Sequence, residues 1–281
     1  SLLFALARNI PQANESVRGG RWEREKFVGV ELYGKTVGIL GLGKVGREVA
    51  KRCLALGMTV IGYDPLLSSE VALKLGVELV PIDEMYRRSD FLTVHVPLTS
   101  ETRGMISEKE IKQCKPGVRI INCARGGVID EDALLKGLES GQVAGAALDV
   151  FSHEPPGMHP MLRHEKVIAT PHLGASTEEA LEKISAQIAL QVADALKERA
   201  FTGVVNAMAL QQGLREDIRP YVLLAEKIGS LQAQLMRGKL RYLTITLSGQ
   251  LLQQSQDLLT AAALKGSLSH LMDEPVNYVN A

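Results

Sequence analysis

The chain has 281 residues, of which 46% are apolar and 23% charged, and its formal net charge is zero. This composition is that of a globular protein with enough apolar material for a sizeable buried core. The balanced charge gives no reason to expect nucleic acid or an anionic membrane as a partner. Three cysteines without C-x-x-C spacing indicate reduced thiols and a cytoplasmic protein. No apolar run reaches the roughly 20 residues that span a bilayer.

The first element in chain order is an amphipathic entry helix over residues 1–18. Leu2, Leu6 and Ile10 share one side of this helix, and Pro11 is a candidate point of interruption. A charged, glycine-rich loop is expected to follow it.

From residue 35 onward, short apolar runs rich in β-branched residues alternate with amphipathic stretches. These runs are TVGIL (36–40), TVIGY (59–63), VELV (77–80), FLTVHV (91–96), VRIINC (118–123), AGAALDV (144–150) and VIAT (167–170). Apolar strands that alternate with helices predict a parallel sheet covered on both faces. We therefore expect an α/β fold, a Rossmann-type doubly wound sheet of about seven strands.

The last third of the chain has a different pattern. A long helix is expected from residue 176 or 177 to about 198, because STEEALEK begins with a hydroxyl cap and places acids in the first turn. FTGVVNA (201–207) should be a short extended tail. Residues 208–281 suggest Gln- and Leu-rich helices around one strand, RYLTITLSG (241–249).

The hexapeptide GLGKVG at 41–46 fits the pattern G-x-G-x-x-G, which alone is weak. Here it follows a predicted strand and opens a predicted helix, as a dinucleotide site requires. Gly41 would make the tight turn, Gly43 would let backbone approach a pyrophosphate, and Gly46 would allow close helix–strand packing. The alternative is a group of turn glycines beside an ordinary strand-end acid.

Asp64 ends the second strand, about 20 residues beyond the glycine loop. A carboxylate at this place accepts hydrogen bonds from the adenosine ribose hydroxyls and repels a 2′-phosphate. The expected cofactor is therefore NAD rather than NADP.

Three polar side chains follow the ends of consecutive predicted strands: Arg125, Glu154 and His172. Ligands of open α/β sheets bind beyond the carboxyl ends of the strands, so these groups can meet there. His172 can exchange a proton with a carbonyl oxygen or hydroxyl, Glu154 can orient the imidazole, and Arg125 can hold a substrate carboxylate. Each alone could be an ordinary loop residue, but together behind a dinucleotide loop they predict an active site.

The motifs GLGKVGREVA, YDP, VHVPLTSETRGMI, INCARGGVIDEDAL, AALDVFSHEPP and PHLGASTEEA resemble the D-isomer-specific 2-hydroxyacid dehydrogenases. WERE, followed by F-x-G-x-E-L-x-GK, together with NCARGG, PHLGAST and TGVVNA, is most similar to the phosphoglycerate dehydrogenase branch of that family. The resemblance is dense to about residue 206 and looser beyond it.

This resemblance implies roles for individual residues. Arg125, Glu154 and His172 would be catalytic, Asp64 would hold the ribose, and Asp149 would lie near the nicotinamide carboxamide. The implied cofactor-binding set comprises Gly41, Gly43, Lys44, Val45, Gly46, Asp64, Val96, Pro97, Cys123, Ala124, Arg125, Asp149, His172, Leu173, Gly174 and Ala175. Val96 stands where animal members of the family typically carry Thr, so one cofactor hydroxyl contact is expected to be lost or replaced by backbone.

The resemblance also implies a division of the chain. Residues 1–175 would form the NAD-binding domain, 176–206 the crossing helix and tail of the substrate domain, and 207–281 part of an α+β regulatory-type domain. The family's substrate-binding lobe would precede residue 1, so we expect a fragment truncated at both ends.

The function that this resemblance implies is the NAD-dependent interconversion of 3-phosphoglycerate and 3-phosphohydroxypyruvate, in serine biosynthesis. Two alternatives remain: a reductase of glyoxylate, hydroxypyruvate or another 2-keto acid, and an NAD-sensing scaffold similar to corepressors. The expected partners are a phosphorylated 2-hydroxy acid and further copies of the chain, as a dimer or tetramer. Residues 1–33 and the helix after Glu131 would form the interface, as in dimers of this family, although the apolar helix 1–11 could equally pack internally. The remaining histidines are not spaced as metal ligands, so we expect no metal.

Overall fold

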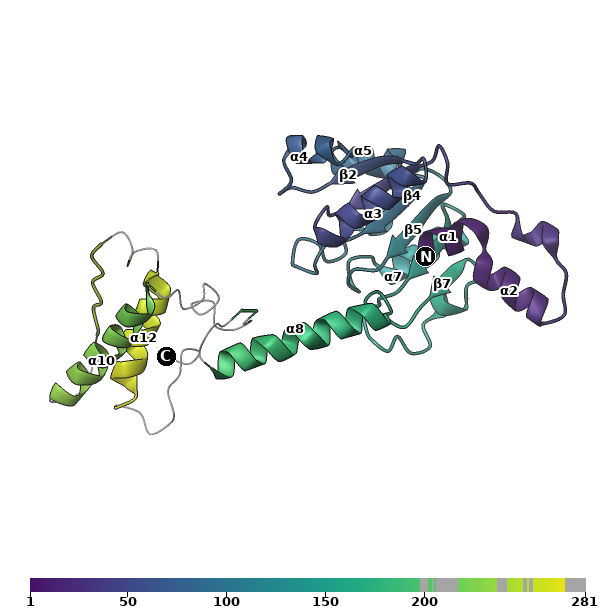
Figure 1. Cartoon of the computed structure of the whole chain (residues 1–281). Helices are drawn as coiled ribbons and strands as arrows, with labels where there is room; N and C mark the ends of the chain where they lie inside the picture. The colour runs from purple at the N-terminus through teal and green to yellow at the C-terminus, as the bar shows by residue number, and fades with distance from the viewer. Residues whose placement is uncertain are drawn as a thin grey trace. The chain divides into compact units, whose positions relative to one another are not determined.

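The computed structural model describes residues 1–197, 202–203, 205, 217–236, 242–249, 252 and 255–270 (Figure 1). The chain divides into two compact units, Ser1–Ser176 and Thr177–Ala281. The second unit combines the two segments predicted as 176–206 and 207–281, and the division between those segments stays a prediction.

The first unit is built on a single seven-stranded sheet with the order β3-β2-β1-β4-β5-β6-β7. Every neighbouring pair is parallel, so the predicted Rossmann-type fold is confirmed. The strands are β1 (Thr36–Leu40), β2 (Thr59–Tyr63), β3 (Glu78–Leu79), β4 (Phe91–Val94), β5 (Val118–Asn122), β6 (Val143–Leu148) and β7 (Val167–Ala169). Each lies within a predicted apolar run or extends it by one residue.

Helices cover both faces of this sheet, because successive residues of each strand point to opposite sides. Ile120 and Ala146 pack with α5, α6 and α7, whereas their neighbours Ile121 and Ala147 pack with α1 and α3. The helices of this unit are α1 (Leu2–Arg8), α2 (Ile10–Arg18), α3 (Lys44–Ala55), α4 (Ser69–Lys74), α5 (Ile82–Arg88), α6 (Glu108–Gln113) and α7 (Glu131–Glu139), with short 3-10 turns η1 (Arg24–Phe27) and η2 (Pro160–Arg163).

Two predictions about element ends were wrong. The entry helix is broken at Asn9, which adopts a left-handed conformation with φ 53°, and not at Pro11. Asn tolerates that conformation, and Pro11 fits the first turn of α2 because no intrahelical N–H bond is needed there. Strand β4 ends at Val94, two residues before the end of the predicted run 91–96, so His95 lies just beyond the strand and is half-buried.

The second unit contains three long helices among its described residues: α8 (Glu178–Leu196), α10 (Arg219–Leu235) and α12 (Gln256–Leu268). The predicted cap of α8 is confirmed, since the Thr177 hydroxyl accepts a hydrogen bond from the Ala180 amide at 3.2 Å. Helices α10 and α12 pack closely through glycine: a Cβ atom on Gly229 would lie 2.1 Å from the Ala263 carbonyl oxygen.

The strand predicted at 241–249 is not formed, because its described residues 242–249 are irregular. A strand needs a hydrogen-bonded neighbour, and no other strand of the second unit is present among the residues the structure describes. The predicted extended tail at 201–207 falls mostly outside the described residues. Within the described part of the chain, no helix combines the length and apolarity needed to cross a membrane.

The difference in burial between two leucines of the first unit predicts that their substitution lowers the free energy of unfolding by different amounts. Leu134 on α7 is fully buried, whereas Leu73 on α4 is 79% exposed. We expect Leu134→Ala to lower the free energy of unfolding by about 2–5 kcal/mol through lost transfer energy and a cavity. Leu73→Ala should change it by less than about 0.5 kcal/mol. Urea unfolding followed by circular dichroism checks both values, and equal effects would contradict the assignment of the core.

Candidate active site

The predicted site segments gather at one edge of the sheet because its strands are parallel. The glycine loop follows β1, Asp64 follows β2, and the other segments follow β4, β5, β6 and β7. The strand order changes direction between β1 and β4, which carry their chain onward to opposite halves of the sheet. Such a switch point leaves a crevice beyond the carboxyl ends of the strands.

The glycine loop has the geometry that its pattern predicts. Gly41 has φ 89°, and a Cβ atom on it would lie 2.6 Å from the His95 carbonyl oxygen. A Cβ atom on Gly46 would lie 2.0 Å from the Gly41 carbonyl oxygen, so the start of α3 packs directly on the turn. A Cβ atom on Gly43 would meet nothing within 4 Å, which leaves open space where a phosphate could approach.

Leu42, in the middle of this loop, is held from two sides. Its amide donates to Asp64 Oδ2 at 2.8 Å, and its carbonyl oxygen accepts from Arg47 Nε at 2.8 Å. Asp64 Oδ1 accepts from the Leu66 amide at 2.9 Å. Asp64 therefore supports the glycine loop. This role adds to its predicted one, which is to bind the adenosine ribose.

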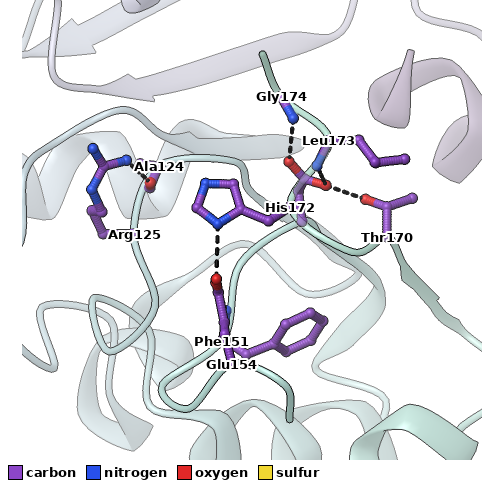
Figure 2. Close-up of polar contacts among 9 residues, drawn as sticks. Ala124, Arg125, Phe151, Glu154, Thr170, His172, Leu173 and Gly174 are labelled. Carbon is purple, nitrogen blue, oxygen red and sulfur yellow. Dashed lines mark hydrogen bonds and ion pairs between the residues drawn. The ribbon is translucent and has the colours of Figure 1, made fainter. Parts of the chain in front are cut away.

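Asp149, directly after β6, is the main support of the loop that carries His172; Figure 2 labels its partners Thr170, Leu173 and Gly174. Its buried carboxylate accepts from Thr170 Oγ1 at 2.5 Å, from the Leu173 amide at 2.7 Å and from the Gly174 amide at 2.8 Å. The His172 amide donates to the Asp149 carbonyl oxygen at 2.9 Å. These bonds hold His172 in a left-handed conformation with φ 54°, which costs a non-glycine residue free energy.

The structure brings His172 and Glu154 together from two different loops. Nδ1 of the imidazole lies 2.8 Å from Glu154 Oε2, and a dashed line marks this contact in Figure 2. The other carboxylate oxygen, Oε1, accepts from the Phe151 amide at 3.1 Å. The bond with His172, and then the one from Phe151, hold the pKa of Glu154 below its usual value. The carboxylate is thus ionised at neutral pH, and this pairing is lost as the pH falls through that lowered pKa.

Arg125 lies on the neighbouring loop, after β5, and its side chain is exposed (Figure 2). Its guanidinium donates to the Ala124 carbonyl oxygen at 2.6 Å. No hydrogen bond or ion pair joins it to Glu154 or His172, and it is paired with no acid among the described residues. The guanidinium therefore keeps donors for an incoming anion.

The other predicted cofactor residues line the same edge. Lys44 and Val45 are exposed at the start of α3, and a Cβ atom on Gly41 would lie 2.8 Å from Val96 Cγ1. Burial, and then the charge of Asp149, raise the pKa of the Cys123 thiol to about 11, so this thiol is neutral. The remaining residues of the predicted cofactor-binding set are also at least partly exposed at this edge. They are Pro97, Ala124, Leu173, Gly174 and Ala175.

Three supporting residues were not predicted. Buried Asn122 accepts from the Ala124 amide at 3.0 Å and donates to the Arg125 carbonyl oxygen at 2.9 Å, which shapes the loop. Thr170 donates to Asp149, and a Cβ atom on Gly126 would lie only 1.8 Å from the Phe151 carbonyl oxygen. In the sequence, Asn122 could have been noticed as a polar residue at the end of an apolar strand.

His95 also lies at this edge, but it is unsuited to proton exchange at neutral pH. Burial lowers the pKa of its imidazole to about 4, and Nε2 lies 3.1 Å from Thr93 Oγ1. Among the described residues, no three His, Cys, Asp or Glu side chains gather as a metal site. At this edge, the histidine that is hydrogen-bonded to a carboxylate is therefore His172, through Glu154.

A family comparison agrees with this geometry. Residues 1–174 match the model of the D-isomer specific 2-hydroxyacid dehydrogenase NAD binding domain. The chain belongs to the D-isomer specific 2-hydroxyacid dehydrogenase family, and NAD is the cofactor of the matched domain. Residues 217–281 match a second model, the D-3-phosphoglycerate dehydrogenase intervening domain.

Individual relatives narrow the similarity further. The chain is 47% identical over 281 residues to the D-3-phosphoglycerate dehydrogenase of Pongo abelii, covering 100% of this chain and 53% of that protein. The chain thus spans about half the length of the curated relatives it matches. The predicted resemblance to the phosphoglycerate dehydrogenase branch is confirmed.

Solved structures confirm the fold. A glyoxylate reductase from Paecilomyes thermophila matches with TM-score 0.65 and 36% identity, over 69% of this chain and 59% of that one. The D-lactate dehydrogenase of Aquifex aeolicus, complexed with NAD and lactic acid, matches with TM-score 0.64 and 30% identity, over 70% of this chain and 64% of that one.

The geometry of the glycine loop predicts different effects for two alanine substitutions, one on cofactor affinity and one on stability. Gly43→Ala has room for its methyl group, so the thermal midpoint should hold while NAD affinity falls on the order of tenfold, because the methyl occupies the phosphate's approach. Gly46→Ala would overlap the Gly41 carbonyl oxygen and should lower the thermal midpoint itself. Calorimetric titration with NAD and thermal unfolding separate the two, and unchanged NAD affinity in Gly43→Ala would refute the assigned role.

Proposed function

We propose that this chain is part of an NAD-dependent D-3-phosphoglycerate dehydrogenase, which oxidises 3-phosphoglycerate to 3-phosphohydroxypyruvate at the entry to serine biosynthesis. The observation that carries the chemistry is the bond between His172 Nδ1 and Glu154 at the dinucleotide edge of the sheet. The choice of substrate is supported by 47% identity to a D-3-phosphoglycerate dehydrogenase over the whole chain, and by the match to its intervening domain.

The residues at the edge fit NAD. Gly41 and Gly46 bring the backbone into a turn that a larger side chain would disrupt, and Gly43 leaves an open approach to the first amides of α3. Those free amides favour an anion, so Lys44 and Val45 would bind the pyrophosphate through their backbone. Bound NAD supplies the acceptor for the hydride that leaves the substrate carbon.

His172 would act as the proton acceptor in the oxidation of the hydroxyl group. Since Nδ1 bonds Glu154, Nε2 is the nitrogen left to face the substrate. The ionised Glu154 fixes the ring orientation and stabilises the imidazolium that forms when Nε2 takes the proton. Arg125 would bind the substrate carboxylate through a two-pronged interaction and orient the neighbouring hydroxyl. In the reverse direction His172 would return the proton to the carbonyl oxygen.

A second candidate function is the reduction of glyoxylate or a related 2-keto acid. It is favoured by the 36% identity to a protein described as a glyoxylate reductase. The same three side chains would serve that reaction, so the distinction depends on which substrates the full-length protein turns over. An NAD-sensing scaffold has no comparable observation in its favour.

We further propose a homo-oligomeric, cytoplasmic protein. The apolar side chains of Trp22, Val28 and Tyr33 are largely exposed, so burial against a second copy would stabilise this segment. The three cysteines are free thiols, as in proteins of a reducing compartment.

The acid–base pair predicts how two substitutions act in the full-length protein. His172→Ala should lower turnover of 3-phosphoglycerate by a factor on the order of 100 or more, because the proton acceptor is lost. Glu154→Gln should reduce turnover less, since an amide can still orient the ring but carries no charge. NAD affinity should survive both changes. Following NADH absorbance measures turnover, and His172→Ala with wild-type turnover would exclude the assigned role.

Asp64 predicts selectivity between the two nicotinamide dinucleotides. The wild-type chain should bind NAD more tightly than NADP, because the carboxylate repels a 2′-phosphate. Asp64→Ala should narrow this difference, and should also weaken binding of both cofactors since the Leu42 amide loses its acceptor. Calorimetric titration of both proteins with both cofactors checks this. Equal affinities of the wild type for NAD and NADP would contradict the ribose assignment.

A further inference from the structure

Glu131 is a partly buried acid at the first position of α7, outside the predicted set of site residues. The helix is already capped by Asp130, whose Oδ1 accepts from the Ala133 amide at 3.0 Å. The carboxylate of Glu131 is directed elsewhere: Oε1 accepts from the Ser152 amide at 2.6 Å, across 21 positions of sequence. A bond from an amide to a carboxylate is stronger than one between neutral groups.

Ser152 stands within the loop that presents Glu154 to His172. In this loop two consecutive amides are bound by two carboxylates: the Phe151 amide donates to Glu154 and the Ser152 amide to Glu131. The first bond is internal to the loop, and the second ties the loop to a helix. Glu131 thereby limits how far the segment carrying Glu154 can move.

The same place is where the Arg125 loop meets the Glu154 loop. A Cβ atom on Gly126 would lie 1.8 Å from the Phe151 carbonyl oxygen and 2.6 Å from the Ser152 amide nitrogen, so the two backbones are in direct contact. Helix α7 continues from the loop that bears Arg125. The Glu131 bond therefore fastens the loop of one proposed catalytic side chain to that of another.

We propose that Glu131 is a positioning residue for the reaction, acting through Glu154 by holding the Ser152 amide. The expected effect on turnover rests on the proposed function, whereas the expected effect on the loop does not. A looser loop would leave the Glu154 carboxylate and the His172 ring in their productive arrangement for a smaller fraction of the time, so turnover falls while cofactor binding is kept.

A neighbouring acid separates this role from a general effect on the helix. Asp132 lies in the same first turn and would contribute equally to the helix dipole. Its side chain is 85% exposed and lies 3.5 Å from His159 Nε2, away from the Ser152 amide. Asp132→Ala is therefore the matched control for Glu131→Ala.

The kinetic test uses the full-length protein and follows NADH formation from 3-phosphoglycerate. Glu131→Ala should lower kcat on the order of tenfold with little change in NAD affinity, as expected when a positioned group is released. Glu131→Gln should restore kcat to within about threefold of wild type, because its amide oxygen still accepts from Ser152. Asp132→Ala should stay close to wild type. Wild-type kcat in Glu131→Ala, or equal losses in the Ala and Gln variants, would overturn the proposal.

A double substitution tests whether Glu131 acts through Glu154. If it does, adding Glu131→Ala to Glu154→Gln should cost much less turnover than adding it to the wild type. Fully additive losses would overturn the coupling.

Amide hydrogen exchange at Ser152 provides a readout that is independent of activity. The Ser152 amide should exchange slowly in the wild type and in Glu131→Gln, and much faster in Glu131→Ala, with thermal midpoints showing that all three are folded. If the wild type oxidises no 2-hydroxy acid, the proposed function fails while this exchange pattern still decides whether Glu131 holds the loop. Equal exchange in all three proteins would overturn the inference while leaving the proposed function intact.

Discussion

The reversal of strand order between β1 and β4 is the constraint on which the site depends. Parallel strands deliver their carboxyl ends to one edge, and the reversal opens that edge by sending the chain from β1 and from β4 in opposite directions. The glycine loop then stands on one side of the opening, with the loops of Arg125, Glu154 and His172 following the strands on the other. Residues that are 131 positions apart, Gly41 and His172, become parts of one surface through topology alone. Side-chain contacts only refine that placement.

Within this frame, polar side chains set the fine geometry of the loops. Asp149 collects three donors and holds His172 in a left-handed conformation that costs about 1–3 kcal/mol and would not persist unsupported. Asn122 shapes the turn that leads to Arg125, through hydrogen bonds with the Ala124 amide and the Arg125 carbonyl oxygen. Asp64 and Arg47 together fix the backbone of Leu42 between the glycines. The groups proposed to react are exposed, whereas Asp149 and Asn122, which hold their loops, are buried.

The fold was predictable because apolar runs and glycine spacing are local signals. All seven strands fell within one residue of runs whose β-branched residues and bounding Gly, Pro or Asp could be recognised directly. The edge that collects Arg125, Glu154 and His172 followed from the parallel topology, and the pairing of Glu154 with His172 was also predicted. The hydrogen bonds by which Asp149 and Asn122 hold these loops were not predicted. The bond between Glu131 and the Ser152 amide spans 21 positions and leaves no periodic trace in the sequence. The break at Asn9 was missed because Pro11 carries the stronger breaking signal, although a helix accepts proline in its first turn. Residues 242–249 have the alternation of a strand, yet alternation cannot supply the pairing partner that a strand requires.

The central claim is that the dinucleotide crosses the switch point, with its phosphates on the glycine loop and its reactive ring beside the His172–Glu154 pair. A crystal structure of this chain with NAD tests it most directly. We expect the pyrophosphate against the amides that begin α3, and the nicotinamide ring at the ends of β4 to β7, facing Nε2 of His172. A cofactor bound on another face of the sheet, or one with its nicotinamide ring beside Asp64 and its adenosine beside His172, would contradict the account.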